Sequence, residues 1–406
     1  MTFRLLVAPL LLGAACGVLI PSAARAASLQ PVDDWDAMGV PSTVSMYLYL
    51  PDNLAANAPI LVLAHYCGGT AAAVFGQAQA GGVVAAADQY GFIMIVPQAA
   101  NSDGSGRCWD VGSTSALSRD GGGDTEAIAR MVDYTLTHHD ANAERVYVTG
   151  DSSGGMMTEA LLALYPDVFR AGAAFAGVPA GCWAVDNPDG AWSNPCAGGS
   201  VTHTPDEWRS IVENMSPGHT GRRPRVQLFH GDADDIISFT NHSEAIKQWT
   251  AVLGLSESPT STETVQLGTH QATRQMWENS CGFVVLDAFS SMGGDHGPSD
   301  ALFEADYVIP FLGLDQPGPA DPEVAQCADD SSNGSDITGS TVTGGTTSST
   351  GSEPSSVATT SAGSSSSLTS GGTTAGGSSS GGTAETVSGI GKEVSIFIEI
   401  ESIRAR

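Results

Sequence analysis

A single segment in the first half of the chain restricts the possible folds more than any other. The apolar run at residues 146–149 leads into Gly-Asp-Ser-Ser-Gly at residues 150–154, and an apolar helical pattern follows at once. A Gly-x-Ser-x-Gly sequence between a buried strand and a helix is typical of a nucleophile elbow, a tight turn that presents a serine at the edge of a sheet. This arrangement predicts that Ser152 is an activated nucleophile and that strands and helices alternate along the chain.

Short apolar runs of strand length do alternate with longer helical patterns. The runs that indicate buried strands are residues 60–64, 92–96, 146–149, 173–178, 226–230 and 284–289. The helical patterns begin at residue 124 and cover residues 156–165, 243–253 and 301–312. This alternation predicts an α/β protein with a doubly wound, mostly parallel sheet. Because no linker interrupts residues 27–327, we expect a single domain over that range.

The N-terminal end is predicted to lie outside this domain. Residues 1–26 combine Arg4, a long apolar stretch and the small-x-small sequence Ala24-Arg25-Ala26, which is the pattern of a secretory signal peptide. The alternative, a lipid anchor at Cys16, is disfavoured because the third residue before it is Gly13 rather than leucine. The sequence therefore predicts a secreted, extracellular protein.

The C-terminal end has a different composition. Residues 328–390 consist mainly of serine, threonine and glycine, and residues 391–406 follow as a short tail of unknown role. Such a linker buries too little apolar surface to offset the entropy lost on ordering, so we expect it to be disordered. Linkers of this kind can tether a binding module, but no cluster of cysteines or aromatic residues follows this one.

The chain is strongly acidic. It has 44 aspartate and glutamate residues against 16 lysine and arginine residues, a formal net charge of -28, and its only lysines are Lys247 and Lys392. Proteins bind nucleic acids and anionic membranes through clustered basic side chains, which this composition does not supply. We therefore expect a neutral substrate, no nucleic-acid or membrane partner, and a monomer.

The cysteines point to an oxidising compartment. Apart from Cys16, six cysteines remain, an even number that predicts three disulfides: Cys67, Cys108, Cys182, Cys196, Cys281 and Cys327. Sequence alone does not decide the pairing, although Cys182 and Cys196 would close a loop rich in glycine, proline and asparagine. No Cys-x-x-Cys or His-x-x-x-His pair occurs, so we expect no metal and no other cofactor.

An activated serine needs an acid and a base. The strand expected to end at His230 leads into a turn that holds Asp232, Asp234 and Asp235. The His-Gly-x-x-Asp spacing favours Asp234 as the acid, with the other two aspartates as alternatives. His296 lies in a glycine-rich turn after the last expected strand and is the expected base, whereas His230 precedes the acids and is interpreted as structural. The order serine, aspartate, histidine is that of the α/β-hydrolases, so we expect this fold.

The negative charge that develops on a carbonyl oxygen during acyl transfer needs hydrogen-bond donors. The backbone N–H of Ser153, directly after the nucleophile, is the expected first donor. The second is expected in the loop after the strand at residues 60–64, from the N–H of Cys67 or, as an alternative, of Gly68. A disulfide between Cys67 and Cys108 would hold this loop rigid.

With these residues assigned, the chain resembles the fungal-type acetylxylan esterases and related feruloyl esterases of carbohydrate esterase family 1, and more distantly the polyhydroxybutyrate depolymerases. The matching segments are HYCGGT at 65–70, CWDV at 108–111, GGGD at 121–124, GDSSGGMM at 150–157, YPDVF at 165–169, AGVPAGC at 176–182, TPDEW at 204–208 and KQW at 247–249. The resemblance spans residues 30–313. It implies the same catalytic triad, Ser152, Asp234 and His296, and extracellular deacetylation of plant-wall xylan.

The substrate is less constrained than the reaction. Trp109, Trp183 and Trp208, together with Trp192, offer flat surfaces on which sugar rings or a cinnamoyl group can stack. The resemblance favours removal of acetyl groups from xylan in the plant cell wall. A feruloyl esterase acting on arabinoxylan is the first alternative, and a polyhydroxyalkanoate depolymerase or a non-catalytic wall-binding protein are others.

Overall fold

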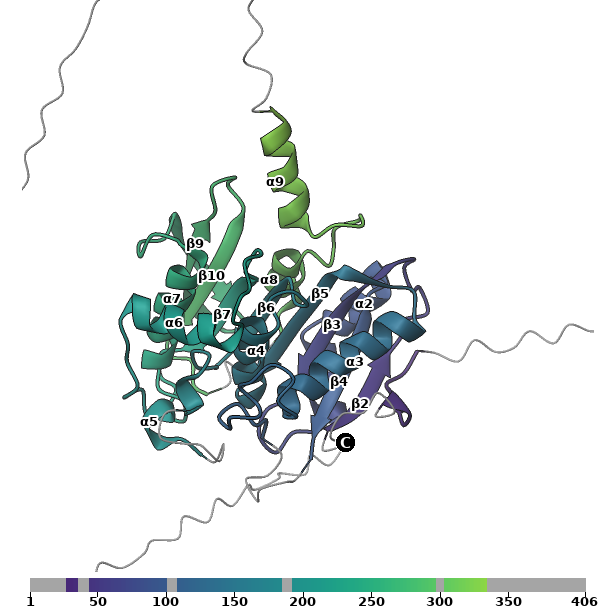
Figure 1. The fold of residues 1–406 in the computed structure, drawn as a ribbon, viewed down its shortest axis with the longest axis horizontal. Coiled ribbons are helices and arrows are strands. Elements are labelled where there is room, and N and C mark those ends of the chain that lie inside the picture. The colour runs from purple at the N-terminus through teal and green to yellow at the C-terminus, as the bar shows by residue number, and fades with distance from the viewer. Residues whose placement is uncertain (1–26, 36–43, 101–107, 185–191, 297–302, 334–406) are drawn as a thin grey trace, which may run out of the picture. The chain divides into compact units, whose positions relative to one another are not determined.

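The structure is a computed structural model that describes residues 27–35, 44–100, 108–184, 192–296 and 303–333. The predicted signal peptide, the short C-terminal tail and the linker beyond Asn333 lie outside these residues. The described part holds a sheet of ten strands with helices on both faces (Figure 1). The predicted α/β-hydrolase architecture with a mostly parallel sheet is thereby confirmed.

The strands are β1 (Gln30–Val32), β2 (Val44–Tyr49), β3 (Ala58–Ala64), β4 (Ile93–Ala99), β5 (Ala141–Asp151), β6 (Ala171–Phe175), β7 (Arg225–Gly231), β8 (Ser261–Leu267), β9 (His270–Glu278) and β10 (Val284–Ser291). The helices are α1 (Ala71–Ala80), α2 (Val83–Tyr90), α3 (Asp124–His138), α4 (Ser153–Leu164), α5 (Asn194–Ala197), α6 (Pro205–Met215), α7 (Thr240–Leu253), α8 (Ala305–Leu312) and α9 (Pro322–Asn333). A 3₁₀ turn covers Cys182–Ala184.

The strand order across the sheet is β1-β2-β4-β3-β5-β6-β7-β10-β9-β8. Six neighbouring strands in this order, β4, β3, β5, β6, β7 and β10, pair in parallel. The sheet ends in antiparallel pairs on both sides, β1 with β2 and β8 with β9. The C-terminal ends of β3, β5, β6, β7 and β10 therefore lie along the same edge of the sheet, where α/β proteins place their sites.

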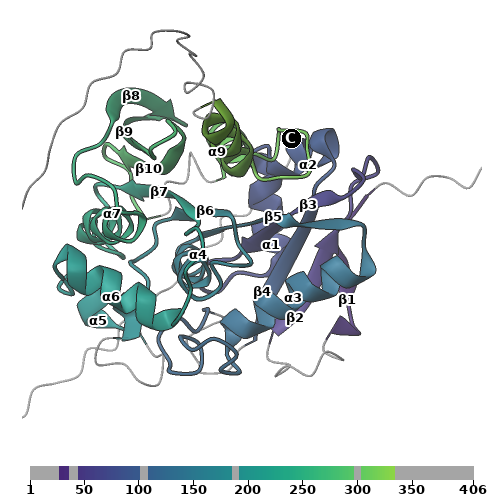
Figure 2. The ribbon, with the colours of Figure 1, turned by 45° about the horizontal axis from the view of Figure 1, so that its top comes forward.

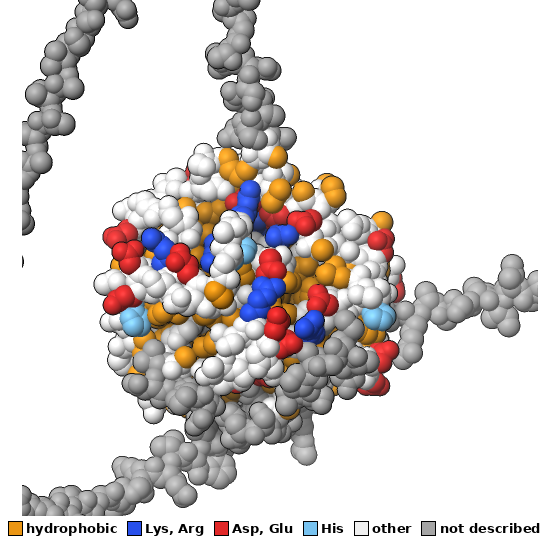
Figure 3. Space-filling model, viewed as in Figure 1, with side chains coloured by type: hydrophobic (Ala, Val, Ile, Leu, Met, Phe, Trp, Pro, Cys, Tyr) orange, Lys and Arg blue, Asp and Glu red, His pale blue; other side chains and the backbone are white. Residues whose placement is uncertain are grey.

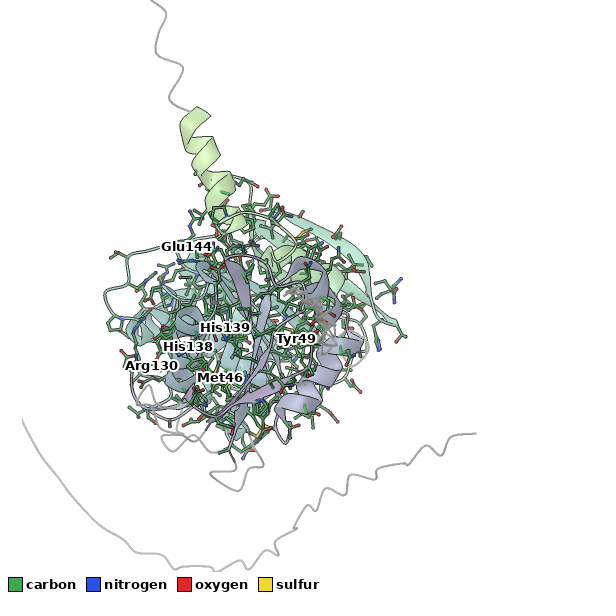
Figure 4. All side chains as sticks on the ribbon, turned by 90° about the vertical axis from the view of Figure 1, so that its right-hand side faces the viewer. Met46, Tyr49, Arg130, His138, His139 and Glu144 are labelled. Carbon is green, nitrogen blue, oxygen red and sulfur yellow. A yellow bond between two sulfur atoms is a disulfide. The ribbon has the colours of Figure 1, made fainter. Side chains whose placement is uncertain are left out.

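Each face of the sheet buries its own core. Helices α7, α4 and α3 follow one another across one face (Figure 2), while α1, α2 and α8 cover the other. Side chains along a strand point alternately to the two faces of the sheet, so each strand contributes to both cores. In β2, Met46 packs into the core on the α3 side and Tyr49 into the core on the α2 side (Figure 4). Strands buried on both sides explain why the apolar runs in the sequence are continuous.

Several helices and strands were not predicted, namely β1, β2, α1, α2, α5, α6, β8, β9 and α9. Strands β8 and β9 form an edge hairpin, and β8 has the sequence STETVQL with mostly exposed side chains, so it carries no apolar run. Helix α6 begins with a capping box in which the Thr204 hydroxyl accepts from the Glu207 N–H and the Glu207 carboxylate accepts from the Thr204 N–H. The sequence Thr-Pro-Asp-Glu is a signal for this helix start.

Basic side chains on the face formed by α3 and α4 are paired with acids. Arg119 forms an ion pair with Asp167, and Arg130 lies 3.4 Å from Glu126 and 3.8 Å from Asp133. Figure 3 shows the same arrangement, in which blue and red side chains lie next to one another across this face. These arginines therefore do not form the positive patch that a polyanion would need.

The segment after α8 is fixed to the edge of the sheet opposite the strand C-termini. The fully buried guanidinium of Arg225, the first residue of β7, forms an ion pair with Asp321. The Tyr147 hydroxyl donates to the same carboxylate over 3.0 Å. Beyond it, a disulfide joins Cys327 of α9 to Cys281, a pairing that the sequence had left open. Helix α9 continues to Asn333, so the start of the linker at residue 328 was placed too early.

We predict that Asp321→Asn lowers the free energy of unfolding by about 3 kcal/mol, because it leaves the buried charge of Arg225 without its main partner. Urea denaturation followed by tryptophan fluorescence measures this change. The matched control is Asp315→Asn in the same segment, whose half-exposed carboxylate accepts a long hydrogen bond of 3.4 Å from the Gln316 side chain. We expect that control to change stability by less than about 0.5 kcal/mol. Equal stability of the two variants would contradict a structural role for the buried pair.

Candidate active site

Ser152 occupies the turn between β5 and α4. Its φ of 54° and ψ of -117° lie in a region that side-chain-bearing residues rarely adopt, and α4 begins at the next residue. Its N–H donates to the carbonyl oxygen of Phe175 over 2.9 Å, which ties the turn to the end of β6. Strand, turn and helix thus follow one another as the sequence predicted.

The two glycines of the elbow are required by close backbone contacts. A Cβ atom on Gly154 would collide with the carbonyl oxygen of Ala64 and lie 2.8 Å from that of His65. A Cβ atom on Gly150 would also lie 2.8 Å from the Ala64 oxygen. The start of α4 therefore packs directly on the end of β3, and the loop after β3 lies beside Ser152.

Three side chains from three strand ends form a continuous hydrogen-bonded relay. The Nε2 atom of His296 lies 2.9 Å from the Oγ of Ser152, and its Nδ1 lies 2.8 Å from the Oδ2 of Asp234. Ser152 follows β5, Asp234 follows β7 and His296 follows β10, so the parallel pairing brings them to one edge. A relay of this geometry can take the proton of a serine hydroxyl as its oxygen attacks a carbonyl carbon.

The structure separates the three aspartates that the sequence proposed as acids. Asp234 is buried, and its Oδ1 accepts from the N–H groups of Ile236 over 2.9 Å and Ile237 over 2.8 Å. The Asp232 carboxylate accepts from the N–H of Gly293 over 2.7 Å, and Asp235 is exposed. Only Asp234 is hydrogen-bonded to His296 among these three.

The acid and the base shift each other's pKa. Burial alone would raise the pKa of Asp234, but hydrogen bonds from His230 and His296 hold that pKa well below its usual range. Burial alone would lower the pKa of His296, but the hydrogen bond and charge of Asp234, helped by Asp151 and Asp235, raise that pKa above its ordinary value. Asp234 is therefore ionised at neutral pH and stabilises the imidazolium that forms when His296 takes a proton.

Asp151, the residue before Ser152, is a buried carboxylate that the sequence analysis did not consider. Its Oδ1 has no hydrogen-bond partner among the described residues. Burial raises the pKa of Asp151 to about 7, against the lowering effects of His296 and of the Ser152 backbone. It adds negative charge near His296 once the pH exceeds that value. In the sequence, the only sign of this charged group is an aspartate at the second position of the Gly-x-Ser-x-Gly segment.

The loop after β3 is held by buried hydrogen bonds. The Nε2 of His65 accepts from the N–H of Ala99 over 3.0 Å, so its Nδ1 carries the proton and donates to the carbonyl oxygen of Tyr66 over 2.7 Å. The expected disulfide between Cys67 and Cys108 is present and joins this loop to the segment that follows β4. The loop is therefore rigid next to the nucleophile turn. The N–H groups of Cys67 and Ser153 stay a prediction as oxyanion donors.

The three tryptophans predicted to bind substrate are buried, so they offer no exposed stacking face. Trp109 donates from Nε1 to the carbonyl oxygen of His65 over 2.8 Å, and Trp208 donates to the buried carboxylate of Glu244 over 2.7 Å. Their exposed fractions are 3% and 0%, and that of Trp183 is 6%. The prediction was wrong for these positions because residue type alone does not distinguish a core tryptophan from a surface one.

Trp192 is the exposed tryptophan of the four that were considered, with 48% of its surface accessible. Its ring contacts Trp183 edge-on at 5.2 Å, and its Nε1 donates to the Asn194 side chain over 3.1 Å. The expected disulfide between Cys182 and Cys196 holds the same segment. The N–H of Ser238 donates to Ala197 over 2.8 Å, so this segment packs against the loop that carries Asp234.

Among the residues that the structure describes, no group of three or more histidine, cysteine, aspartate or glutamate side chains is arranged to hold a metal ion. Within the same residues, no helix has both the length and the apolar character needed to cross a bilayer.

The chain is similar to known esterases in both sequence and structure. The family model described as Esterase PHB depolymerase matches residues 44–186. Acetylxylan esterase A of Aspergillus oryzae is 45% identical over 248 residues, which are 60% of this chain and 77% of the relative. Acetylxylan esterase A of Aspergillus ficuum is 43% identical over 243 residues, 59% of this chain and 78% of the relative. The solved structure of an acetyl xylan esterase from Aspergillus awamori matches with a TM-score of 0.62 and 36% identity, over 71% of this chain and 99% of that one.

Proposed function

Because the chain belongs to the family of the fungal acetylxylan esterases, we propose that it is a serine carboxylesterase that removes acetyl groups from xylan. The observation that carries the proposal is the unbroken relay from Ser152 through His296 to Asp234 at the end of three parallel strands. The family explains the substrate, and the relay explains the chemistry.

The reaction proceeds in two acyl transfers. In the first, the Oγ of Ser152 attacks the acetyl carbonyl carbon while the Nε2 of His296 takes the serine proton. The tetrahedral intermediate collapses, the sugar oxygen leaves with the proton from His296, and an acetyl-serine ester remains. In the second, His296 takes a proton from water, the hydroxide attacks the ester, and acetate leaves as Ser152 regains its proton.

We infer that the backbone N–H groups of Cys67 and Ser153 bind the oxyanion in both steps. This role is supported by their position on the two backbone segments that meet at Gly154, and by the disulfide that fixes the first segment. Donors fixed before the reaction need no reorganisation as charge develops, which is the main source of their effect on the rate. Because protein donors and a side-chain base supply all of this chemistry, the scheme requires no metal or organic cofactor.

The location where the protein acts follows from the disulfides and the substrate. Disulfides at Cys67, Cys182 and Cys281 are typical of proteins from oxidising compartments, and xylan lies outside cells, so the protein acts as a secreted enzyme. We expect it to act as a monomer on plant cell-wall polysaccharide.

Trp192 is the expected platform for a xylose ring, in place of the buried tryptophans. We predict that Trp192→Ala raises the KM for acetylated xylo-oligosaccharides by about threefold to tenfold, since a lost aromatic contact costs about 0.5–1.5 kcal/mol. The kcat/KM for 4-nitrophenyl acetate, which has no sugar, should change less than about twofold. The matched control is Tyr90→Ala, which removes an exposed aromatic residue at the end of α2. An equal loss on both substrates would rule out a sugar-binding role.

The decisive test compares the substrates directly. Residues 27–406 are assayed on acetylated xylan and on methyl ferulate, with Ser152→Ala as the blank. Acetate release without ferulate release supports the proposal. Ferulate release at equal or higher kcat/KM would assign the chain to the feruloyl esterases, and no release from either substrate would refute action on xylan.

A further inference from the structure

The Asp234 carboxylate is hydrogen-bonded to two histidines. Its Oδ2 lies 2.8 Å from the Nδ1 of His296 and 3.1 Å from the Nε2 of His230. Its Oδ1 accepts from the N–H groups of Ile236 and Ile237. The carboxylate is thus surrounded by donors on both oxygens, and a serine–histidine–aspartate relay by itself does not require the second imidazole.

The tautomer of His230 follows from its contacts. Its Nε2 lies 2.9 Å from the carbonyl oxygen of Ile237 as well as 3.1 Å from Asp234. Because both neighbours accept hydrogen bonds, Nε2 must carry a proton and donate to them. The position of this donor is fixed, since His230 is the penultimate residue of β7, is 2% exposed, and pairs with Ser290 of β10.

Sharing of the carboxylate has a direct consequence for the base. Each hydrogen bond to a carboxylate stabilises its charge and reduces the attraction it exerts on a neighbouring cation. Without the donor on His230, Asp234 would attract the imidazolium of His296 more strongly, and only its Oδ1 would still be held by backbone donors, so its Oδ2 could move away from Nδ1. Loss of this donor should therefore make His296 more basic and less well oriented.

We propose that His230 is a positioning residue of the triad, whose Nε2–H orients the Asp234 carboxylate and limits the basicity of His296. The inference rests on the proposed function only in assigning these residues to an esterase. Besides Asp234, the charged groups that act on the pKa of His296 are Asp151 on β5 and Asp235 in the acid loop, while His242 of α7 lies 5.9 Å from His230 between ring centroids. All three are unchanged in His230→Gln and His230→Asn.

The test uses two amides that differ by one methylene. In His230→Gln the side-chain NH2 can reach the place of the imidazole Nε2, whereas in His230→Asn it falls short of Asp234. We expect His230→Asn to lower kcat for 4-nitrophenyl acetate by about tenfold to hundredfold, as for a lost hydrogen bond to a charged group. It should also move the acidic limb of the kcat/KM profile upward by about half to one pH unit. His230→Gln should keep kcat and the position of the acidic limb close to those of the wild type.

The matched control is His242→Leu, which removes a buried imidazole from the same region. His242 stacks on Phe239 at 5.3 Å, and burial lowers the pKa of His242 to about 3, so it is neutral. We expect this variant to keep the acidic limb within about 0.2 pH units of the wild type. The pKa of His296, read by NMR in the inactive Ser152→Ala protein with and without His230→Asn, should shift as the kinetic limb does.

Two outcomes overturn the inference. One is an unchanged His296 pKa in His230→Asn, and the other is an equal loss in His230→Gln and His230→Asn. If His230→Asn does not fold, ¹⁵N-histidine spectra of the wild type decide, because protonation of His230 at Nδ1 alone would exclude donation to Asp234. A wild type that hydrolyses 4-nitrophenyl acetate but releases nothing from acetylated xylan would refute the proposed substrate and leave this inference intact.

Discussion

Ser152→Ala is expected to lower kcat for ester hydrolysis by about 10⁴- to 10⁶-fold, because no other group in the relay can form the acyl intermediate. The fold should be unaffected. Alanine can adopt the positive φ of 54° at this position as serine does, and among the described residues the Ser152 hydroxyl is hydrogen-bonded to His296 alone. Steady-state rates on 4-nitrophenyl acetate together with thermal melts measure the two effects separately.

The adjacent serine provides a stringent comparison. The Ser153 hydroxyl makes only a long hydrogen bond, 3.4 Å, to the carbonyl oxygen of His65. Ser153→Ala keeps its backbone N–H and should cost at most about tenfold in kcat. An organophosphonate should label Ser152 in the wild type and in Ser153→Ala. Strong activity in Ser152→Ala, or labelling at Ser153 instead, would show that the nucleophile is misassigned.

Asp234→Asn is expected to lower kcat by about 10⁴-fold, the loss typical of a triad whose acid becomes an amide. The amide NH2 would have to face either the Nδ1–H of His296 or the N–H groups of Ile236 and Ile237. Either orientation sets donor against donor, so the imidazole is driven into the wrong tautomer or orientation. Rates measured across the pH range separate this loss from a simple shift of the profile.

Asp235→Asn is the matched control for this substitution. It removes the same charge one residue later, from an exposed side chain. Its influence on His296 is through space alone, so we expect a change in kcat of less than about threefold. Loss of activity in Asp235→Asn with retention in Asp234→Asn would transfer the role of the acid to Asp235.

Much of the relay could be predicted because each of its members follows a buried, mostly apolar strand. Ser152, Asp234 and His296 come after strands that are buried on both faces, and parallel strands necessarily end at one edge. The order of the residues along the chain and the composition of the turns then left few candidates for the acid and the base. The edge strand β8 was missed for the opposite reason, since a strand with mostly exposed side chains carries no apolar signal.

Other features depend on contacts between segments that are far apart in the sequence. The burial of Trp208 follows from its partner Glu244 on another helix, and the exposure of Trp192 from how its segment docks. His230 was correctly excluded as the base, but its position on the carboxylate of Asp234 depends on how the turn after β7 folds back. Residue types and spacing do not encode such distances.

The bond between Cys281 and Cys327 determines where tension on the C-terminal end of the chain is transmitted. A pull applied beyond α9 reaches Cys327 first and passes covalently to the turn between β9 and β10, so it bypasses the non-covalent contacts of α9. That turn lies at the edge of the sheet opposite Ser152. Attachment of the protein to a solid support through its C-terminal end should therefore load a covalent bond and leave the catalytic edge accessible.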